Sequence, residues 1–211
     1  NLLREGKSED TIFVTGNTAI DALKTTVKSD YTHPELEWAK GSRLITITAH
    51  RRENLGEPMH HMFRAIRKIM DEHDDVKAIY PIHMNPIVRK AAEEELGGCD
   101  RIHIIEPLDV LDFHNFMERS YLILTDSGGI QEEAPSLGKP VLVMRDTTER
   151  PEGVKAGTLK LVGTDEKTIY QNFKTLLENK EEYEKMSKAS NPYGDGTACK
   201  QIADILEKTL F

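Results

Sequence analysis

The chain has 211 residues, of which 38% are hydrophobic and 30% are charged, and its formal net charge is -8. These values indicate a globular protein with a proper core, and the acidic balance argues against nucleic acid as a main partner. No apolar stretch approaches the ~20 residues of a membrane span, the N-terminus lacks the order of a signal peptide, and Cys99 and Cys199 match no metal or redox spacing. We therefore expect a cytoplasmic protein that does not bind membranes.

Strand-like and helix-like segments alternate along most of the chain. Residues 1–6 read as the tail of a helix closed by Gly6, as though the chain belonged to something longer. Hydrophobic patterns predict strands at residues 11–15, 43–48, 77–82, 102–105, 121–124, 141–144 and 159–162. They predict helices at residues 19–27, 58–72, 87–96, 130–137, 166–186 and 198–210, and another that carries Val110, Phe113, Phe116 and Met117. This alternation is typical of the α/β class, with a mostly parallel sheet and helices on both faces.

The turn Asp126-Ser127-Gly128-Gly129 is the most informative segment. It follows a buried strand and leads into the helix that begins near Ile130, so backbone N–H groups and the Ser127 hydroxyl are expected to face an anion such as phosphate. Glu132 and Glu133, one turn inside this helix, can accept hydrogen bonds from a sugar. The alternative is that Asp126 or Ser127 only caps the helix and that the glutamates only favour its dipole.

Polar residues gather after several other predicted strands. They are His50-Arg51-Arg52, His83-Met84-Asn85, Glu106-Pro107 and the segment from Arg145 to Arg150. Because ligands of such sheets bind beyond the carboxyl ends of the strands, this convergence favours a binding site over a simple cap.

For several side chains near these strand ends, the sequence leaves two interpretations open. His50 stands beside arginines suited to pyrophosphate, or in a solvated loop; His83 is a ligand-binding or a structural turn histidine. Arg150 contacts a nucleotide, or forms a surface salt bridge with Glu149 or Glu152. Phe113 belongs to the core or stacks on a base.

Other motifs in the chain carry little chemistry. His60 and His61 face different directions on a predicted helix and lack a suitably spaced third ligand, so we expect no metal site. Gly153, Gly157 and Gly163 indicate only loop flexibility. A Walker lysine pattern and a GxGxxG pattern are both missing from the sequence, which gives ATP hydrolysis and dinucleotide chemistry little support.

Several long motifs stand out along the chain. They are Thr15-Gly16-Asn17-Thr18, Ala49 to Asn54, Pro81 to Pro86, Leu124 to Pro135 and Arg145 to Glu152. Together they resemble the bacterial non-hydrolysing UDP-N-acetylglucosamine 2-epimerases, and the resemblance covers essentially the whole chain. It implies the C-terminal, UDP-binding half of a GT-B-like fold with two Rossmann-like domains. The implied division is a remnant of the N-terminal domain or linker at 1–10, a Rossmann-like domain at 11–190 and a C-terminal helical segment at 191–211.

The resemblance also implies roles for single residues. Ser127, Gly128 and Gly129 would hold the diphosphate and Glu133 the ribose hydroxyls. Phe113 would lie near the uracil, and Arg150 would add nucleotide contacts. His50 would be the active-site histidine. Arg51 and His83 match positions associated with a second, allosteric UDP-GlcNAc. Leu108 stands where some members carry Gln, so a side-chain contact to the base is not expected there.

The implied enzyme is an isomerase that interconverts UDP-GlcNAc and UDP-ManNAc by elimination and re-addition of UDP through 2-acetamidoglucal, without cofactor or metal. Family carboxylates for proton transfer at C2 lie in the N-terminal domain, so the present chain is expected to bind UDP without turnover. The complete enzyme is expected to be a homodimer. The alternatives are the donor domain of a GT-B glycosyltransferase, a non-catalytic nucleotide-sugar sensor and a hydrolysing epimerase.

Overall fold

The computed structural model describes residues 1–210 and contains a six-stranded parallel sheet in the order β3-β2-β1-β4-β5-β6. The order reverses direction between β1 and β4, which places a topological switch point at the centre of the sheet. The expected Rossmann-like α/β class is therefore confirmed. The strands are β1 (Arg43–Thr48), β2 (Val76–Pro81), β3 (Ile102–Ile105), β4 (Leu122–Thr125), β5 (Val141–Val143) and β6 (Leu159–Leu161).

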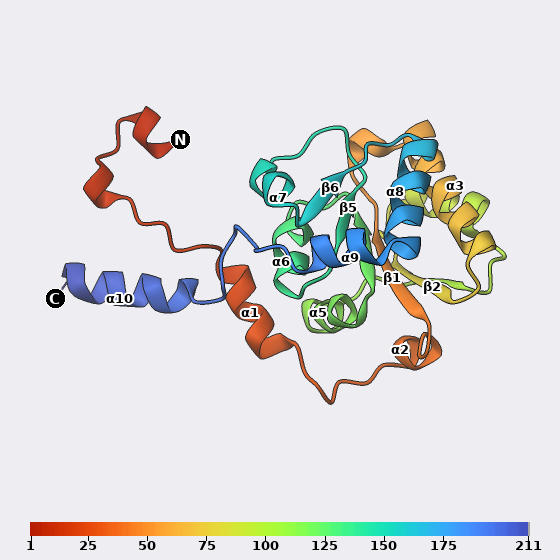
Figure 1. The fold of residues 1–211 in the computed structure, drawn as a ribbon, viewed down its shortest axis with the longest axis horizontal. Helices are drawn as coiled ribbons and strands as arrows, with labels where there is room; N and C mark the ends of the chain where they lie inside the picture. Colours follow the sequence, from red (N-terminus) through yellow and green to blue (C-terminus); the bar gives the residue numbers. More distant parts are fainter. Residues whose placement is uncertain (211) are drawn as a thin grey trace.

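Helices cover both faces of the sheet (Figure 1). On one face, α3 (Glu57–Glu72) packs against α4 (Pro86–Leu96) and α8 (Glu166–Glu178). On the other, α1 (Thr18–Thr26) packs against α5 (Val110–Arg119) and α6 (Ile130–Ser136). Successive residues of β4 alternate between these faces: Leu122 and Leu124 join the α3 core, whereas Ile123 joins the core under α6. Burial on both faces explains why β4 reads as a continuous apolar run.

The register of the central strands brings three loops together. Thr48, the last residue of β1, pairs with Thr125, the last residue of β4, and Thr125 also pairs with Val143 of β5. The segments that follow these three strands therefore begin side by side at one edge of the sheet.

Two local predictions are wrong, and two short helices were missed. Residues 12–17 have no regular secondary structure, and Val14 is 93% exposed, because no neighbouring strand pairs with the expected strand at 11–15. The expected helix at 166–186 is two helices, since Asn179 ends α8 and its side chain caps α9 (Lys180–Ser187). Two short helices were not expected, α2 (Pro34–Trp38) and α7 (Pro151–Ala156).

Gly153 and Gly157 do more than make a loop flexible. Gly153 is a buried residue of α7, and an added Cβ would lie 2.6 Å from Leu159 Cδ2. Gly157 ends that helix in the left-handed conformation, with φ 79°.

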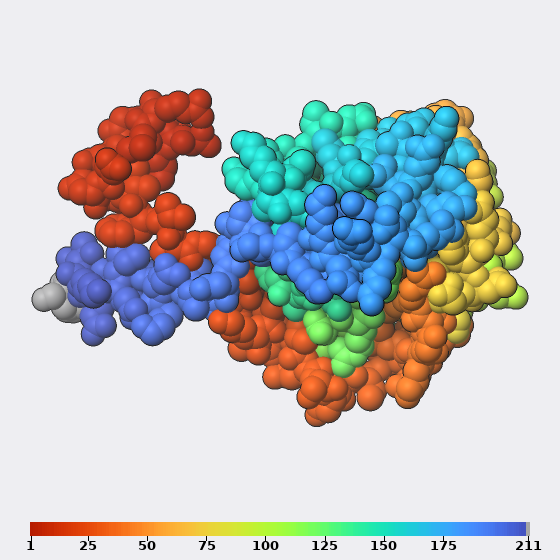
Figure 2. Space-filling model, viewed as in Figure 1, coloured from red at the N-terminus to blue at the C-terminus, as the bar shows by residue number. Residues whose placement is uncertain are grey.

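The two ends of the chain lie together, to one side of the sheet (Figures 1 and 2). The N-terminal segment contains the short 3-10 helices η1 (Leu2–Glu5) and η2 (Glu9–Thr11), and the C-terminal segment contains α10 (Ala198–Leu210). Asp21 of α1 anchors α10, because its carboxylate accepts hydrogen bonds from the N–H groups of Ala198 and Cys199 at 3.1 and 2.9 Å.

The domain boundaries at residues 10 and 190 stay predictions. None of the helices within residues 1–210 combines the length and hydrophobicity that crossing a membrane requires.

Phe63 gives a direct test of the α3 core. Its side chain is fully buried and its ring centroid lies 5.7 Å from that of Tyr80, so Phe63→Ala should lower the free energy of unfolding by about 3–5 kcal/mol in urea denaturation. The matched control is Phe13→Ala, at a residue that is 55% exposed, which should change it by less than about 0.5 kcal/mol. Equal effects of the two substitutions would contradict the assigned core.

Candidate functional site

The turn between β4 and α6 is built as an open backbone loop. Thr125 Oγ1 lies 2.6 Å from Thr48 Oγ1 and accepts a hydrogen bond from the Ser127 N–H at 2.9 Å. Within residues 1–210 the N–H groups of Gly128 and Gly129 donate to no protein acceptor. Gly129 is the N-cap residue of α6 and no side chain caps this helix, so the alternative that Asp126 or Ser127 is a helix cap is wrong. The free amides leave the turn able to bind an anion.

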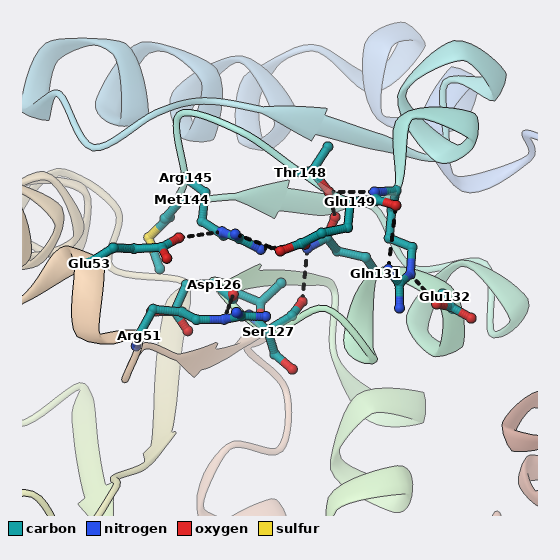
Figure 3. Close-up of polar contacts among 12 residues, drawn as sticks. Arg51, Glu53, Asp126, Ser127, Gln131, Glu132, Met144, Arg145, Thr148 and Glu149 are labelled. Atoms are coloured by element: carbon teal, nitrogen blue, oxygen red, sulfur yellow. Dashed lines mark hydrogen bonds and ion pairs between the residues drawn. The ribbon is translucent and has the colours of Figure 1, made fainter. Parts of the chain in front are cut away.

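Asp126 points away from α6 and organises the neighbouring loop. It is fully buried, and its Oδ2 accepts hydrogen bonds from the N–H groups of His50 and Arg51 at 2.9 and 2.8 Å and from Asn54 Nδ2 at 3.2 Å. Arg51 Nε donates in return to the Asp126 carbonyl oxygen at 3.1 Å (Figure 3). These bonds tie the loop after β1 to the turn after β4.

The segment from 145 to 150 is held against the same turn. Gln131 Nε2 donates to the Ser127 carbonyl oxygen at 3.0 Å, and its Oε1 accepts from the Thr148 hydroxyl at 2.5 Å (Figure 3). Arg145, 4% exposed, donates to Glu53 at 2.9 Å and to both oxygens of Glu149 at 2.8 and 3.0 Å. The hydrogen bonds and charge of Arg145 lower the pKa of Glu149 to about 2.

Arg150 reaches across the turn to Glu132. Its Nε donates to Glu132, which also accepts a hydrogen bond from Asn17 Nδ2, so the expected alternative of a salt bridge with Glu149 or Glu152 is wrong. The Glu132 carbonyl oxygen accepts from Asn191 Nδ2 at 2.9 Å. Glu132 thus links α6 to the segments before α1 and α10, which leaves Glu133 as the carboxylate available to a sugar.

Glu133 lies between the turn and the interior. Its Oε1 would be 3.6 Å from a Cβ placed on Gly129, and its Oε2 is 3.6 Å from Nε2 of the buried His114. Burial, together with the nearby Glu132 charge, raises the pKa of Glu133. Phe113, on α5, is half-buried against the core cluster that contains Ile130. The structure accommodates the core interpretation of Phe113 and leaves contact with a base as a prediction.

His50 and His83 lie together at the end of β1 and β2. Their ring centroids are 5.3 Å apart and the rings are nearly parallel, with 22° between the planes, and both residues are exposed. Arg51 lies closer to the turn, since its Nη2 would be 3.4 Å from a Cβ on Gly128. Of the residues predicted from the sequence, His50, Arg51, Ser127, Gly128, Gly129, Glu133 and Arg150 therefore surround one turn, while His83 borders it through His50.

Sequence reasoning missed the supporting roles of Asp126, Asn54, Gln131, Arg145 and His114. The Asp126–Asn54 and His114–Thr26 pairs are 72 and 88 positions apart along the chain, so only the fold brings them together. Within residues 1–210, no group of three or more His, Cys, Asp or Glu is placed to hold a metal ion.

The fold defines a Rossmann-like domain whose glycine turn lies at the switch point of the sheet. The family described as UDP-N-acetylglucosamine 2-epimerase matches residues 1–207. The chain therefore belongs to the UDP-N-acetylglucosamine 2-epimerase family.

Individual relatives agree with this family. The UDP-N-acetylglucosamine 2-epimerase of Bacillus subtilis (strain 168) is 65% identical over 98% of this chain and 54% of its own length. An S. aureus MnaA–UDP structure has a TM-score of 0.95 at 54% identity, covering 99% of this chain and 57% of that one. A Neisseria meningitidis UDP-GlcNAc 2-epimerase bound to UDP-GlcNAc has a TM-score of 0.89 at 45% identity, covering 98% and 58%. The chain spans about half the length of these relatives.

Asp126 can be tested by two substitutions. Asp126→Ala removes the acceptor of three hydrogen bonds and should lower the free energy of unfolding by about 3 kcal/mol in urea. Asp126→Asn can keep an oxygen at the Oδ2 position and should cost about 1 kcal/mol. The control is the exposed Asp30→Ala, with less than about 0.5 kcal/mol expected. Equal losses for Ala and Asn would show that the hydrogen bonds are not what matters.

The Arg145–Glu149 pair predicts a pH effect. NMR titration should give a pKa of about 2 for Glu149, and Arg145→Gln should move it towards the ordinary 4.5. Because the folded-state pKa is depressed, the stabilisation is present above the ordinary pKa and is lost as the pH falls towards 2. Glu149→Gln, which cannot ionise, should lack this part of the pH dependence. An unchanged titration in Arg145→Gln would contradict the assignment.

Proposed function

We propose that this chain binds the UDP part of a nucleotide sugar and belongs to an isomerase that interconverts UDP-GlcNAc and UDP-ManNAc. The observation that carries the proposal is the Ser127-Gly128-Gly129 turn, in which the Gly128 and Gly129 amides have no acceptor within residues 1–210 and Arg51 lies beside Gly128. Relatives solved with UDP and with UDP-GlcNAc support UDP as its occupant.

The proposed reaction is elimination of UDP to 2-acetamidoglucal, followed by re-addition with protonation on the opposite face of C2. The departing diphosphate gains negative charge, which amides and guanidinium groups at the turn stabilise more strongly in the transition state than in the ground state. Breaking the Arg150–Glu132 pair frees that guanidinium for the ligand. His50, beside the turn, is the proposed catalytic residue that donates a hydrogen bond or proton to the leaving group.

The other half of the chemistry is proposed to come from residues outside this chain. Proton transfer at C2 needs an acid and a base, and the relatives extend over nearly twice the length of this chain. We propose that the complete enzyme is a cytoplasmic homodimer, with no cofactor, and that Arg51 and His83 border a second UDP-GlcNAc.

Measurements on the chain and on a chimera test the proposal. Isothermal titration calorimetry should show that the chain alone binds UDP. When the chain alone is incubated with UDP-GlcNAc in D2O, no deuterium should appear at C2 of the sugar. A chimera that joins it to the N-terminal half of the 65% identical Bacillus subtilis relative should produce UDP-ManNAc with solvent deuterium at C2. In that chimera, His50→Asn should slow exchange by about 10²-fold or more.

Each alternative predicts a different result for the chimera. Sugar transfer to an acceptor indicates a glycosyltransferase, free ManNAc with UDP indicates a hydrolysing epimerase, and binding without C2 exchange indicates a sensor. Turnover by the 211-residue chain alone at an ordinary enzyme rate would contradict the division of the chemistry between two halves.

A further inference from the structure

His114 is a buried histidine to which the proposed reaction gives no role. It lies on α5, is 3% exposed, and faces α1 through one ring nitrogen and α6 through the other. Its Nδ1 is 2.7 Å from Thr26 Oγ1, and its Nε2 is 3.6 Å from Glu133 Oε2. The imidazole therefore stands directly behind the carboxylate proposed to bind a ribose.

The Thr26 hydroxyl assigns the tautomer of this imidazole. Thr26 Oγ1 lies 2.9 Å from the carbonyl oxygen of Ala22, which can only accept a hydrogen bond. The hydroxyl has one hydrogen, so it donates to Ala22 and accepts from the Nδ1–H of His114. A neutral imidazole has no second hydrogen, and the Nε2 lone pair consequently faces Glu133.

The contact between His114 and Glu133 lacks one proton to become a hydrogen bond. The distance of 3.6 Å between His114 Nε2 and Glu133 Oε2 is longer than a hydrogen bond, as expected when neither atom carries a hydrogen. Burial lowers the pKa of His114, while burial and Glu132 raise that of Glu133, so both shifts favour the uncharged forms. Glu132 is itself paired with Arg150, and α1 contributes only the Thr26 hydroxyl to this contact. One shared proton would convert the contact into a short hydrogen bond.

We propose that His114 is a positioning residue for nucleotide recognition, holding Oε2 of Glu133 inward through one shared proton so that Oε1 faces the ribose diol. The inference rests on the proposed function, because it names the group that orients the sugar-binding carboxylate. Oε1 already points to the exposed end of the turn, 3.6 Å from a Cβ position on Gly129. Without His114, Glu133 would be free to rotate, and the hydroxyls would lose a fixed acceptor.

A cycle of ligands and variants tests this role. The 211-residue chain is titrated calorimetrically with UDP and with 2′,3′-dideoxy-UDP, which lacks both hydroxyls. The unaltered chain should prefer UDP by about tenfold, the effect expected when hydrogen bonds to the two ribose hydroxyls are lost. His114→Phe should weaken UDP binding by about tenfold and change binding of the dideoxy ligand less than about twofold. His114→Gln, whose amide can donate to Glu133, should restore most of the preference.

The control is Thr46→Val, which removes a buried hydrogen bond to Ser120 under α5 without touching Glu133. It should leave the ratio of the two affinities unchanged. Equal weakening of both ligands by His114→Phe, or an unaltered chain that binds UDP without preferring it, would overturn the positioning role. If His114→Phe does not fold, loss of the preference in His114→Gln would overturn it as well. Failure of the unaltered chain to bind UDP at all would instead refute the proposed function.

Discussion

The buried carboxylate of Asp126 is the constraint on which the site depends. A buried carboxylate is costly unless hydrogen bonds compensate it. Its Oδ2 accepts from two consecutive backbone amides and Asn54, whereas its buried Oδ1 has no partner within residues 1–210. The three donors belong to the loop after β1, so part of the cost of burying the carboxylate is offset only when that loop lies against β4. Asn54 also donates to the Met144 carbonyl oxygen at 3.2 Å, which extends the constraint to the strand end of β5. The carboxylate thereby fixes three strand ends relative to one another.

The three arginines near the turn differ in how many partners hold each guanidinium group. Arg145 forms salt bridges with both Glu53 and Glu149 and is almost fully buried, so it holds the two segments together. Arg51 is held by one bond to a carbonyl oxygen, and Arg150 by one carboxylate with its side chain 33% exposed. A fully committed guanidinium cannot readily exchange partners, so Arg51 and Arg150 are better placed than Arg145 to contact a ligand.

Strand ends and turn chemistry were predictable because they depend on local patterns. The six strands appear within one residue or so of their predicted bounds, and the helix after the glycine turn begins at Ile130 as expected. The failures are short or context-dependent elements. Residues 11–15 have β-forming composition but no partner strand, and Asn179 interrupts a continuous helical pattern through a cap that only the observed chain path reveals. The candidate site residues could be listed from the sequence, whereas the residues that support them could not.

His114 illustrates why those supports escape sequence reasoning. On α5 it occupies the buried stripe of an amphipathic helix, where a histidine reads as a core residue, and its partners lie 88 positions away on α1 and on the neighbouring helix α6. Its Nδ1 lies beside the Thr26 hydroxyl, which is also within hydrogen-bond distance of a helix carbonyl. Residues of α1 and α6 therefore flank the two nitrogens of a single α5 side chain. The surroundings of Glu133 are consequently set by three packed helices, while the glycine turn depends on the strands beneath it.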